Sequence, residues 1–245
     1  MSNTVATDLL PLPTPQTHHV GGHIQYLATT DSTNIRALEA CADGHVFVAE
    51  CQTAGRGRHG KQWHSIPHVG LWFSICLTAP LPGAGFAAAL SVRDAVADTL
   101  PLSIRWPNDL YAEQRKVCGI LTEQRGNWLA LGIGINVNHI REDFPTTLRH
   151  RAGSLAMATG HQWDRGRLLK TVLECLDPLV DRLRRGEHDT VRDEWVAACD
   201  IIGKHIRRGG ISGQVAAVDD DGALLVSTRM GMQRVTSGDI VVLGV

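Results

Sequence analysis

Residues 55–61 read GRGRHGK, a run in which glycine alternates with arginine, histidine and lysine. Glycine lets a backbone wrap closely around a ligand, and arginine makes paired contacts to a carboxylate or a phosphate. The chain of 245 residues has a formal net charge of only −1, so this positive charge is local. The run is consistent with a loop that binds a small anion, and equally with a solvated turn or a loose RNA-binding tract. The GxxxxGK[ST] spacing of a Walker A motif is absent.

Two further segments place polar groups beside apolar residues. RWPNDL at 105–110 can be a simple strand exit, or an amide and a carboxylate in a rigid turn that hold a nucleotide or its Mg²⁺. Lys116 opens the apolar run KVCGILTE, where an ammonium group is costly unless it meets an anion or reaches solvent. In a regular strand, Gly119 would point to the face opposite Lys116.

The run LALGIGINVN has two different faces. One face carries Leu129, Leu131, Ile133, Ile135 and Val137, and the other carries Ala130, Gly132, Gly134, Asn136 and Asn138. The first face predicts a strand packed on a core. Repeated glycine on the second face favours a floor on which a ligand lies, with tight packing of a helix as the alternative.

Neutral hydrogen-bonding groups occur in DSTN at 31–34, which predicts the N-cap of a helix, and at Gln52. His59, His64 and His68 have no carboxylate or thiolate close in sequence, so we expect them to face solvent rather than to bind a metal.

Composition sets the broad class of the protein. Hydrophobic residues make up 43% and charged residues 20% of the chain, which is typical of a globular protein with a sizeable core. No apolar run approaches the roughly 20 residues of a membrane-spanning helix, so we expect none. The six cysteines show no CxxC spacing, which favours reduced thiols and a cytoplasmic location.

The apolar pattern predicts an α+β fold, because strands and helices do not alternate strictly. Strands are expected at 23–30, 46–50, 71–79, 102–106, 116–124 and 127–138, and helices at 31–41, 85–100 and 168–183. Residues 139–152 lose their apolar period and are expected to form a mobile loop. From about residue 201, short runs separated by turns such as Asp221–Gly222 predict about five strands of a small β-barrel. We therefore expect a loosely ordered tail at 1–22, a main domain at 23–198 and a β domain at 199–245.

The order of DSTN, QTAGRGRHGKQW, RWPNDL, KVCGILTE and GIGINVN closely resembles the biotin–protein ligase family. The resemblance spans residues 24–138. It implies a class II synthetase-like catalytic domain, with a mixed sheet packed on helices, and an SH3-like C-terminal domain. It also implies a reaction in which ATP and Mg²⁺ activate biotin to biotinyl-5′-AMP, followed by transfer of the biotinyl group to a lysine of the biotin carboxyl carrier domain of acetyl-CoA carboxylase.

The resemblance also implies roles for individual residues. Biotin or its adenylate would be contacted by Ser32, Thr33, Asn34, Gln52, Arg56, Gly57, Arg58 and Lys116. ATP would be contacted by Arg56, Arg58, Asn108, Lys116 and Asn136, with Lys116 and Arg58 as the catalytic pair. Gly55, Trp63, Gly119, Gly132 and Gly134 would support the site. No residue is assigned to the adenine base or to the metal.

Two residues depart from the family pattern. Arg105 stands where lysine is common, which keeps the charge but changes its geometry, and His59 stands where a basic residue is frequent. Some family members begin with a DNA-binding domain, but here DSTN starts at residue 31, so no operator binding is expected. Family members often form homodimers, and the sequence leaves that state open.

Three alternatives remain at this stage. A lipoate or octanoate ligase on the same scaffold typically carries an RRxxGGG-like stretch, which this sequence lacks. A non-catalytic RNA-binding protein would use GRGRHGK and the RRGG run at 207–210, and a non-catalytic biotin-binding protein would have lost turnover.

Overall fold

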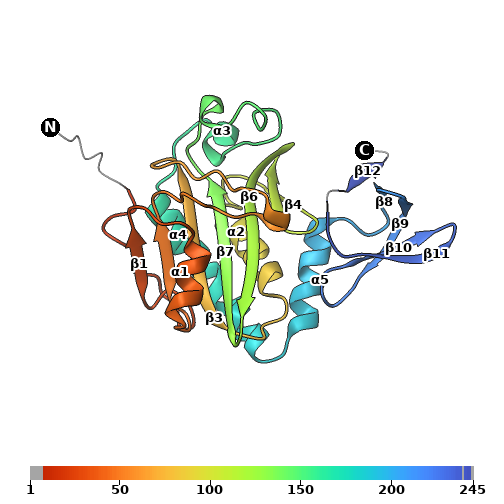
Figure 1. The fold of residues 1–245 in the computed structure, drawn as a ribbon, viewed down its shortest axis with the longest axis horizontal. Helices are drawn as coiled ribbons and strands as arrows, with labels where there is room; N and C mark the ends of the chain where they lie inside the picture. The colour runs from red at the N-terminus through yellow and green to blue at the C-terminus, as the bar shows by residue number, and fades with distance from the viewer. Residues whose placement is uncertain (1–7, 239, 244–245) are drawn as a thin grey trace.

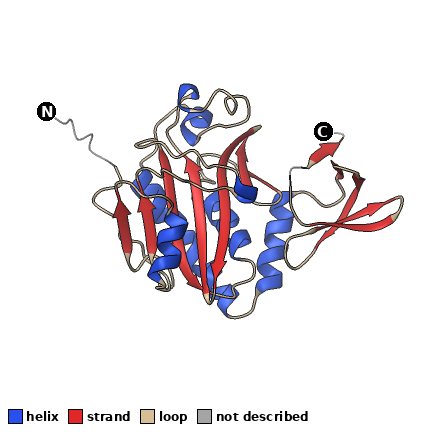
Figure 2. Cartoon of the chain, in the orientation of Figure 1, coloured by secondary structure: helices blue, strands red, loops and turns tan. Residues whose placement is uncertain are grey.

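The computed structural model describes residues 8–238 and 240–243. Within these ranges a seven-stranded mixed sheet forms the body of the protein (Figures 1 and 2). Its strand order is β1 (Ile24–Leu27), β2 (Val46–Ala49), β3 (Gly70–Thr78), β7 (Trp128–Asn136), β6 (Arg115–Arg125), β5 (Asp109–Ala112) and β4 (Ser103–Arg105). Strands β1 and β2 are parallel, and the other neighbouring pairs are antiparallel. The sheet with its helices confirms the predicted α+β class.

Helices cover both faces of this sheet. Helices α2 (Ala84–Ala95) and α4 (Arg165–Arg184) lie behind it in Figure 1, whereas α1 (Thr33–Ala40) lies in front. Helix α5 (His188–Cys199) lies to the right of the sheet, toward the C-terminal strands. Short helical turns occur at η1 (Arg58–Gly60), η2 (Arg141–Asp143) and α3 (Leu155–Thr159). Beside α1, residues of the loops after β2 and β7 line a cavity on the front face.

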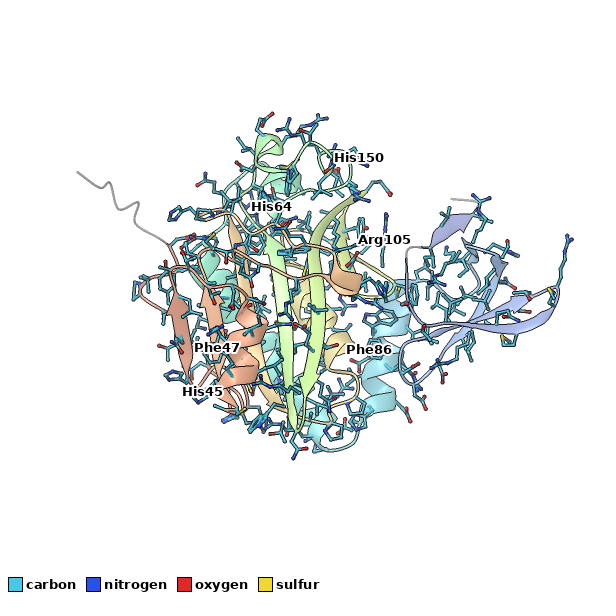
Figure 3. All side chains as sticks on the ribbon, in the orientation of Figure 1. His45, Phe47, His64, Phe86, Arg105 and His150 are labelled. Atoms are coloured by element: carbon cyan, nitrogen blue, oxygen red, sulfur yellow. The ribbon has the colours of Figure 1, made fainter. Side chains whose placement is uncertain are left out.

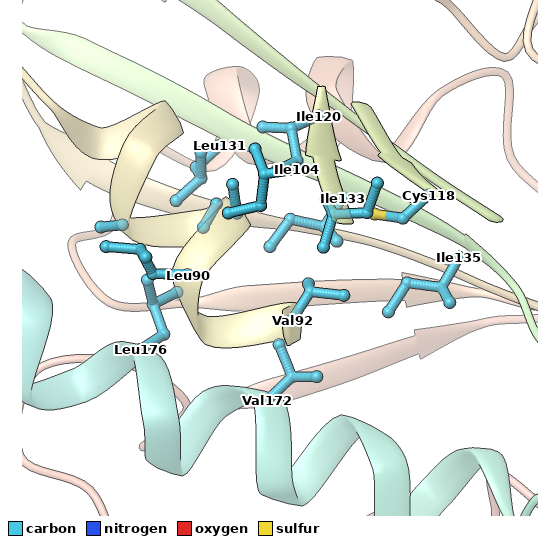
Figure 4. Close-up of a cluster of buried hydrophobic side chains, with 14 of the residues drawn as sticks. Leu90, Val92, Ile104, Cys118, Ile120, Leu131, Ile133, Ile135, Val172 and Leu176 are labelled. Atoms are coloured by element: carbon cyan, nitrogen blue, oxygen red, sulfur yellow. The ribbon is translucent and has the colours of Figure 1, made fainter. Parts of the chain in front are cut away.

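The main core lies between the back face of the sheet and α2 and α4. Figure 4 shows Leu131, Ile133 and Ile135 of β7 pointing toward Leu90 of α2 and Val172 of α4. These β7 side chains are at most 2% exposed, as the predicted alternation requires. Each fully buried residue of this size stabilises the fold by roughly 1.5–3 kcal/mol. The core therefore fixes β7 with Gly132 and Gly134 on the opposite face.

An irregularity in β6 changes one expectation. Leu110 of β5 pairs with Cys118, but the next residue, Tyr111, pairs with Lys116, so Val117 has no partner of its own on β5. Such a bulge reverses the alternation of side chains at that point. A Cβ built on Gly119 would lie 3.3 Å from Cε of Lys116, so both residues face the front of the sheet. The prediction that they point to opposite faces is wrong.

The C-terminal segment forms a separate five-stranded antiparallel sheet within the described residues. Its order is β11 (Gly231–Val235), β10 (Leu224–Thr228), β9 (Ile211–Val218), β8 (His205–Arg208) and β12 (Val241–Leu243). This sheet is consistent with the predicted small SH3-like β domain.

The two sheets meet beside α5. The indole Nε1 of Trp106 donates to the carbonyl of Gly222 at 2.7 Å. Phe86, labelled in Figure 3, packs on Trp195 of α5 with ring centroids 4.8 Å apart. Apolar residues of both parts belong to one buried cluster, so the C-terminal sheet has a fixed place beside the body.

Residues 8–22, expected to belong to a loosely ordered tail, instead pack against α4. Leu9 and Val20 are almost fully buried, and the carboxylate of Asp177 accepts three backbone N–H groups from residues 18–20. Residues 1–7 lie outside the described residues. None of the described helices is long and apolar enough to cross a membrane.

A buried ion cluster ties four segments together next to this region. The guanidinium of Arg165, 1% exposed, donates to Glu50 at 2.6 Å, to Asp8 at 2.6 Å and to the carbonyl of Gly70 at 3.0 Å. Burying a charge is costly unless it is paired and hydrogen-bonded, as it is here. The cluster holds the end of β2 in place, two residues before Gln52.

Candidate functional site

The front face of the sheet carries a cavity of about 1200 Å³. It is bounded by the first turn of α1, the 55–61 loop, β6, β7 and part of the C-terminal sheet. The predicted site residues that line it are Ser32, Thr33, Asn34, Gln52, Arg56, Gly57, Arg58, Trp63, Asn108, Lys116, Gly119, Gly132, Gly134 and Asn136. Two other lining residues, His64 and Arg105, are labelled in Figure 3. The five sequence motifs therefore meet at one place.

Gly55 is the one predicted residue outside the lining of this cavity. It is buried at the start of the 55–61 loop, where its carbonyl accepts the backbone N–H of Trp63 at 2.9 Å. A Cβ built on Gly55 would lie 2.6 Å from the carbonyl oxygen of Trp63. Gly55 thus supports the loop, because only glycine fits this close approach of two backbones.

One end of the cavity is built on the N-terminus of α1. Ser32 occupies the N-cap position, but its side chain makes no capping hydrogen bond. The side chain of Gln52, distant in the sequence, caps the helix instead. Its Oε1 accepts the backbone N–H of Thr33 at 2.9 Å and the Thr33 hydroxyl at 3.2 Å. The prediction that DSTN holds the N-cap position is confirmed, but the capping hydrogen bond comes from Gln52 and not from Ser32. The cap joins two motifs that lie about 20 residues apart in the chain.

A hydrogen-bond network continues from Thr33 across the floor of the cavity. The hydroxyl of Ser74 lies 2.7 Å from Oγ1 of Thr33 and 2.6 Å from Oδ1 of Asn34. Nδ2 of Asn34 donates to Glu123 at 2.8 Å and to the carbonyl of Leu121 at 3.3 Å. Ser32, Thr33 and Asn34 are each at most 4% exposed. This end is a buried polar pocket with its amide orientations fixed, which we call the ring pocket.

The glycine floor is occupied by protein side chains. A Cβ on Gly132 would lie 2.2 Å from Oδ1 of Asn34, and Cβ atoms on Gly119 and Gly134 would lie 2.8 Å and 2.7 Å from the indole of Trp63. The glycines therefore make room for Asn34 and Trp63, which then present their other surfaces to the cavity. The alternative of a packed helix holds in part, because Asn34 over Gly132 and Ala37 beside Ala130 both belong to α1. The expected direct ligand floor does not describe Gly119 and Gly134, which Trp63 covers.

Lys116 and Asp109 form an ion pair at the centre of the cavity, with Nζ 2.6 Å from Oδ1. Their side chains are 30% and 24% exposed, so both remain accessible from the cavity. Nζ also lies 5.4 Å from the ring centroid of Trp63, close enough for a cation–π attraction. The ammonium group is thus held by a carboxylate on one side and an aromatic face on the other.

The two arginines of the loop point to different ends. Nη1 of Arg58 donates to Oδ1 of Asn108 at 3.3 Å, and burial lowers the pKa of Arg58 while the charge of Asp109 opposes that shift. Nη1 of Arg56 donates instead to Oε1 of Glu123 at 2.9 Å, beside the ring pocket. Arg58, Asn108, Asp109 and Lys116 together form what we call the cation cluster.

Residues 139–152, expected to be a mobile loop, are followed directly by Gly153, and the end of this segment pairs with the backbone of Lys116. The backbone N–H of Lys116 donates to the carbonyl of Arg151 at 2.8 Å, and the N–H of Gly153 donates to the carbonyl of Lys116 at 2.9 Å. Nδ2 of Asn136 donates to the Gly153 carbonyl at 2.9 Å. Asn136 therefore also fastens this segment to the end of β7, and Phe144 and Ala152 of the segment line the cavity.

Two residues of the site were not assigned from the sequence. Asp109 lies in RWPNDL and Glu123 ends KVCGILTE, so both stand inside quoted motifs. Their roles depend on strand pairing, because β5 brings Asp109 opposite Gly119 and β6 brings Glu123 opposite Ala130. No strand was predicted at β5, because Asn108 and Asp109 indicate a turn or a strand exit.

The three histidines singled out in the sequence lie on the surface, and one cysteine lines the cavity. His59, His64 and His68 are exposed, as predicted, and the described residues contain no group of three or more His, Cys, Asp or Glu placed to hold a metal ion. Cys199 lines the cavity, but burial raises its pKa to about 12, which keeps the thiol protonated and unreactive at neutral pH.

Comparison with known proteins matches both parts of the chain. Residues 26–139 match the model of the biotin/lipoate A/B protein ligase family, and residues 201–243 match that of the biotin protein ligase C terminal domain.

Three relatives are similar along most of their length. The bifunctional ligase/repressor BirA of Bacillus subtilis is 31% identical over 92% of this chain and 75% of its own length. The biotin–[acetyl-CoA-carboxylase] ligase of Mycobacterium tuberculosis is 31% identical over 89% of this chain and 88% of its own. A solved structure of the Aquifex aeolicus biotin protein ligase, in complex with biotin and ATP, superimposes with a TM-score of 0.78 at 31% identity and covers 91% of this chain and 99% of that one.

These findings point to the same family. They are the two domain matches, the extent of the alignments and the meeting of the five motifs at one cavity. The chain belongs to the biotin protein ligase family.

Proposed function

We propose that this ligase activates biotin with ATP inside the cavity described above and then passes it to a lysine of a biotin carboxyl carrier domain. The observation that best supports the use of this cavity is its division into two ends. The ring pocket offers oriented neutral hydrogen-bonding groups, and the cation cluster offers positive charge. Biotin has the same division, with a neutral ureido ring at one end and a carboxylate at the other.

The chemistry has two displacement steps. In the first, a carboxylate oxygen of biotin attacks the α-phosphorus of ATP, the bond from that phosphorus to the bridging oxygen breaks, and pyrophosphate leaves. In the second, the amine nitrogen of the acceptor lysine attacks the acyl carbon, AMP leaves, and the nitrogen loses a proton. Catalysis of such steps depends mostly on positioning and on charge stabilisation.

The ring pocket suits the neutral end of biotin. Thr33 and Gln52 fix one another at the N-terminus of α1, and Asn34 is fixed by Ser74 and Glu123. A ligand with paired donors and acceptors meets these groups without reorganising them, and such preorganisation favours both affinity and selectivity.

The cation cluster suits the acid end and the phosphates. Lys116 would neutralise the attacking carboxylate and the α-phosphate, with Asp109 holding its ammonium group in place. Arg58 would stabilise charge that develops on the phosphate oxygens, since guanidinium groups match their geometry. Asn108, which accepts from Arg58, would orient that guanidinium.

Magnesium would reach the site with the nucleotide. Mg²⁺ in ATP-dependent sites commonly uses one or two protein oxygens together with substrate phosphates. The described residues fit this limited role, because Asn108 and Asp109 place side-chain oxygens in the cavity while no larger acidic group lies there. The ion would supply further neutralisation of the phosphate charge.

We also propose a cellular location and an acceptor protein for the enzyme. All six cysteines lie within the described residues and all are free thiols, which supports a cytoplasmic enzyme. We propose the carrier domain of acetyl-CoA carboxylase as the acceptor, because the Mycobacterium tuberculosis and Paracoccus denitrificans relatives are named as biotin–[acetyl-CoA-carboxylase] ligases.

The test is an activation assay on the purified protein. The protein is incubated with ATP, Mg²⁺ and either biotin or lipoate, and pyrophosphate release and acyl-adenylate are followed by coupled assay and mass spectrometry. A purified carrier domain is then added, and its mass is measured. We expect adenylate with biotin and a biotinylated carrier. Turnover with lipoate alone would reject the substrate, and no adenylate with either acid would reject the enzyme.

A further inference from the structure

Glu123 contacts both the glycine-rich loop at residues 55–61 and the ring pocket. It lies near the end of β6, where β6 pairs with Ala130 of β7. Its Oε1 accepts from Nη1 of Arg56 at 2.9 Å, and its Oε2 accepts from Nδ2 of Asn34 at 2.8 Å. Each oxygen of one carboxylate thus serves a different element, the loop on one side and α1 on the other.

The contact between Glu123 and Asn34 determines the orientation of the Asn34 side-chain amide, with Nδ2 toward Glu123 and Oδ1 toward Ser74. An amide group can be turned by half a rotation with little change in shape, so its orientation depends on its hydrogen-bond partners. The carboxylate of Glu123 is only an acceptor when ionised, and it therefore requires the NH₂ group of Asn34. Oδ1 is then left for the hydroxyl of Ser74 at 2.6 Å.

The contact to Arg56 holds one limb of the glycine-rich loop. Arg56 stands between Gly55 and Gly57, where the backbone is intrinsically permissive. The opposite limb is held separately, because the N–H of Gly57 donates to the carbonyl of Lys61 at 2.7 Å and Arg58 contacts Asn108. Glu123 thus adds a side-chain contact to the limb nearest the ring pocket, where the N–H of Ala54 also donates to the carbonyl of Asp31 at 2.9 Å.

We propose that Glu123 is a positioning residue that couples the loop to the ring pocket and so controls how long biotin and its adenylate are retained. The carboxylate acts through Arg56 and Asn34, and it makes no bond in the reaction itself. The inference rests on the proposed function, since retention has meaning only for a protein that makes the adenylate.

The Arg56–Glu123 ion pair contributes little to the free energy of unfolding, so its removal should leave the protein folded. The Arg56 and Glu123 side chains are 48% and 26% exposed, and exposed pairs of this kind contribute little to stability. Loss of the carboxylate should therefore change the position of the loop limb much more than the melting temperature. The cation cluster does not involve Glu123, so the chemical step should be spared.

The experiment compares Glu123→Gln, Arg56→Ala and the double variant in the full chain. Biotin, ATP and Mg²⁺ are used to load the adenylate, and its release is followed by chase with unlabelled biotin. We expect Glu123→Gln to raise the release rate and the KM for biotin about tenfold, as for the loss of one charge-assisted contact, while kcat for adenylation changes less than about twofold. When Arg56 is already alanine, Glu123→Gln should raise the release rate by a much smaller factor than it does in the wild-type protein.

A matched control is Glu39→Gln, which removes a comparable arginine–glutamate pair on α1, where Nη1 of Arg36 lies 2.7 Å from Glu39. This variant should release the adenylate at the wild-type rate. A wild-type release rate in Glu123→Gln, or effects of the two single changes that multiply in the double variant, would overturn the inference. Failure of the wild-type protein to form adenylate would instead reject the proposed function.

Discussion

The ammonium group of Lys116 lies 2.6 Å from a carboxylate oxygen of Asp109, inside the cavity on the front of the sheet. This pair exists because the bulge at Val117 turns Lys116 to the same face as Gly119 and because β5 brings Asp109 alongside. The lysine is held by a short ion pair yet remains 30% exposed, so its charge is available to a ligand.

Lys116→Ala should reduce the rate of biotinyl-adenylate formation by about 100-fold or more, as removal of one preorganised charge donor does in other active sites. Pyrophosphate release under saturating ATP and biotin measures the effect. Lys170→Ala is the control, because Lys170 forms a 2.6 Å pair with Glu174 on α4, outside the cavity. A normal rate in Lys116→Ala with a normal circular dichroism spectrum would remove Lys116 from the reaction.

Arg58→Ala should let the adenylate leak from the enzyme. Arg58 reaches Asn108 and the cation cluster, so its loss removes charge beside the phosphate of the intermediate. We expect free adenylate to appear in solution about tenfold faster, in line with a strong charge-assisted hydrogen bond. Filtration of the reaction followed by chromatography measures the free adenylate. Unchanged retention would show that Arg58 does not contact the bound phosphate.

Gly132→Ala should weaken biotin binding, because a Cβ there would lie 2.2 Å from Oδ1 of Asn34 on a backbone that cannot retreat. Asn34 would have to shift within the ring pocket, and the loss of one of its hydrogen bonds should raise the Kd for biotin about tenfold. Isothermal titration with biotin measures the change. Gly210→Ala is the control, since a Cβ on Gly210 would meet nothing within 4 Å. Equal affinities for the two variants would contradict the described role of Asn34.

His139→Phe should make the protein less sensitive to acid. His139 is 1% exposed, its ring lies between Trp72 and Phe144, and neither ring nitrogen has a hydrogen-bond partner among the described residues. Burial lowers the pKa of His139 from 6.5 to about 3. Below pH 6.5 the unfolded chain binds a proton that the folded protein excludes, so folding stability falls as the pH falls toward 3.

Urea denaturation at pH 7 and pH 5 measures this effect. The wild type should lose about 2 kcal/mol more than His139→Phe over this range, if His139 keeps its neutral form when folded. The same loss of stability in both proteins would show that His139 takes up a proton in the folded state.

Much of the fold and the place of the site could be predicted from the sequence. The alternation of Leu129 to Ile135 against Gly132 and Gly134 gave β7 and its two faces, because a strand shows its faces directly in the sequence period. The motifs also marked the residues that meet in the cavity, since family motifs record the positions that line a site.

Roles that depend on pairing between distant segments could not be predicted in the same way. The bulge at Val117 is set by the partner strand β5, and its effect on Lys116 has no local signal. The Gln52 cap of α1 and the contact of Glu123 with Arg56 join residues about 20 and 67 positions apart. The glycine floor likewise depends on Trp63, whose indole reaches it only because the loop folds back on Gly55.

The most direct test of this account is a crystal structure of the protein with biotin and a non-hydrolysable ATP analogue. The account predicts the ureido ring against Thr33, Asn34 and Gln52, and the carboxylate within hydrogen-bonding distance of Lys116 or Arg58 beside the α-phosphate. Biotin bound elsewhere, or bound with its carboxylate turned away from both cations, would contradict it.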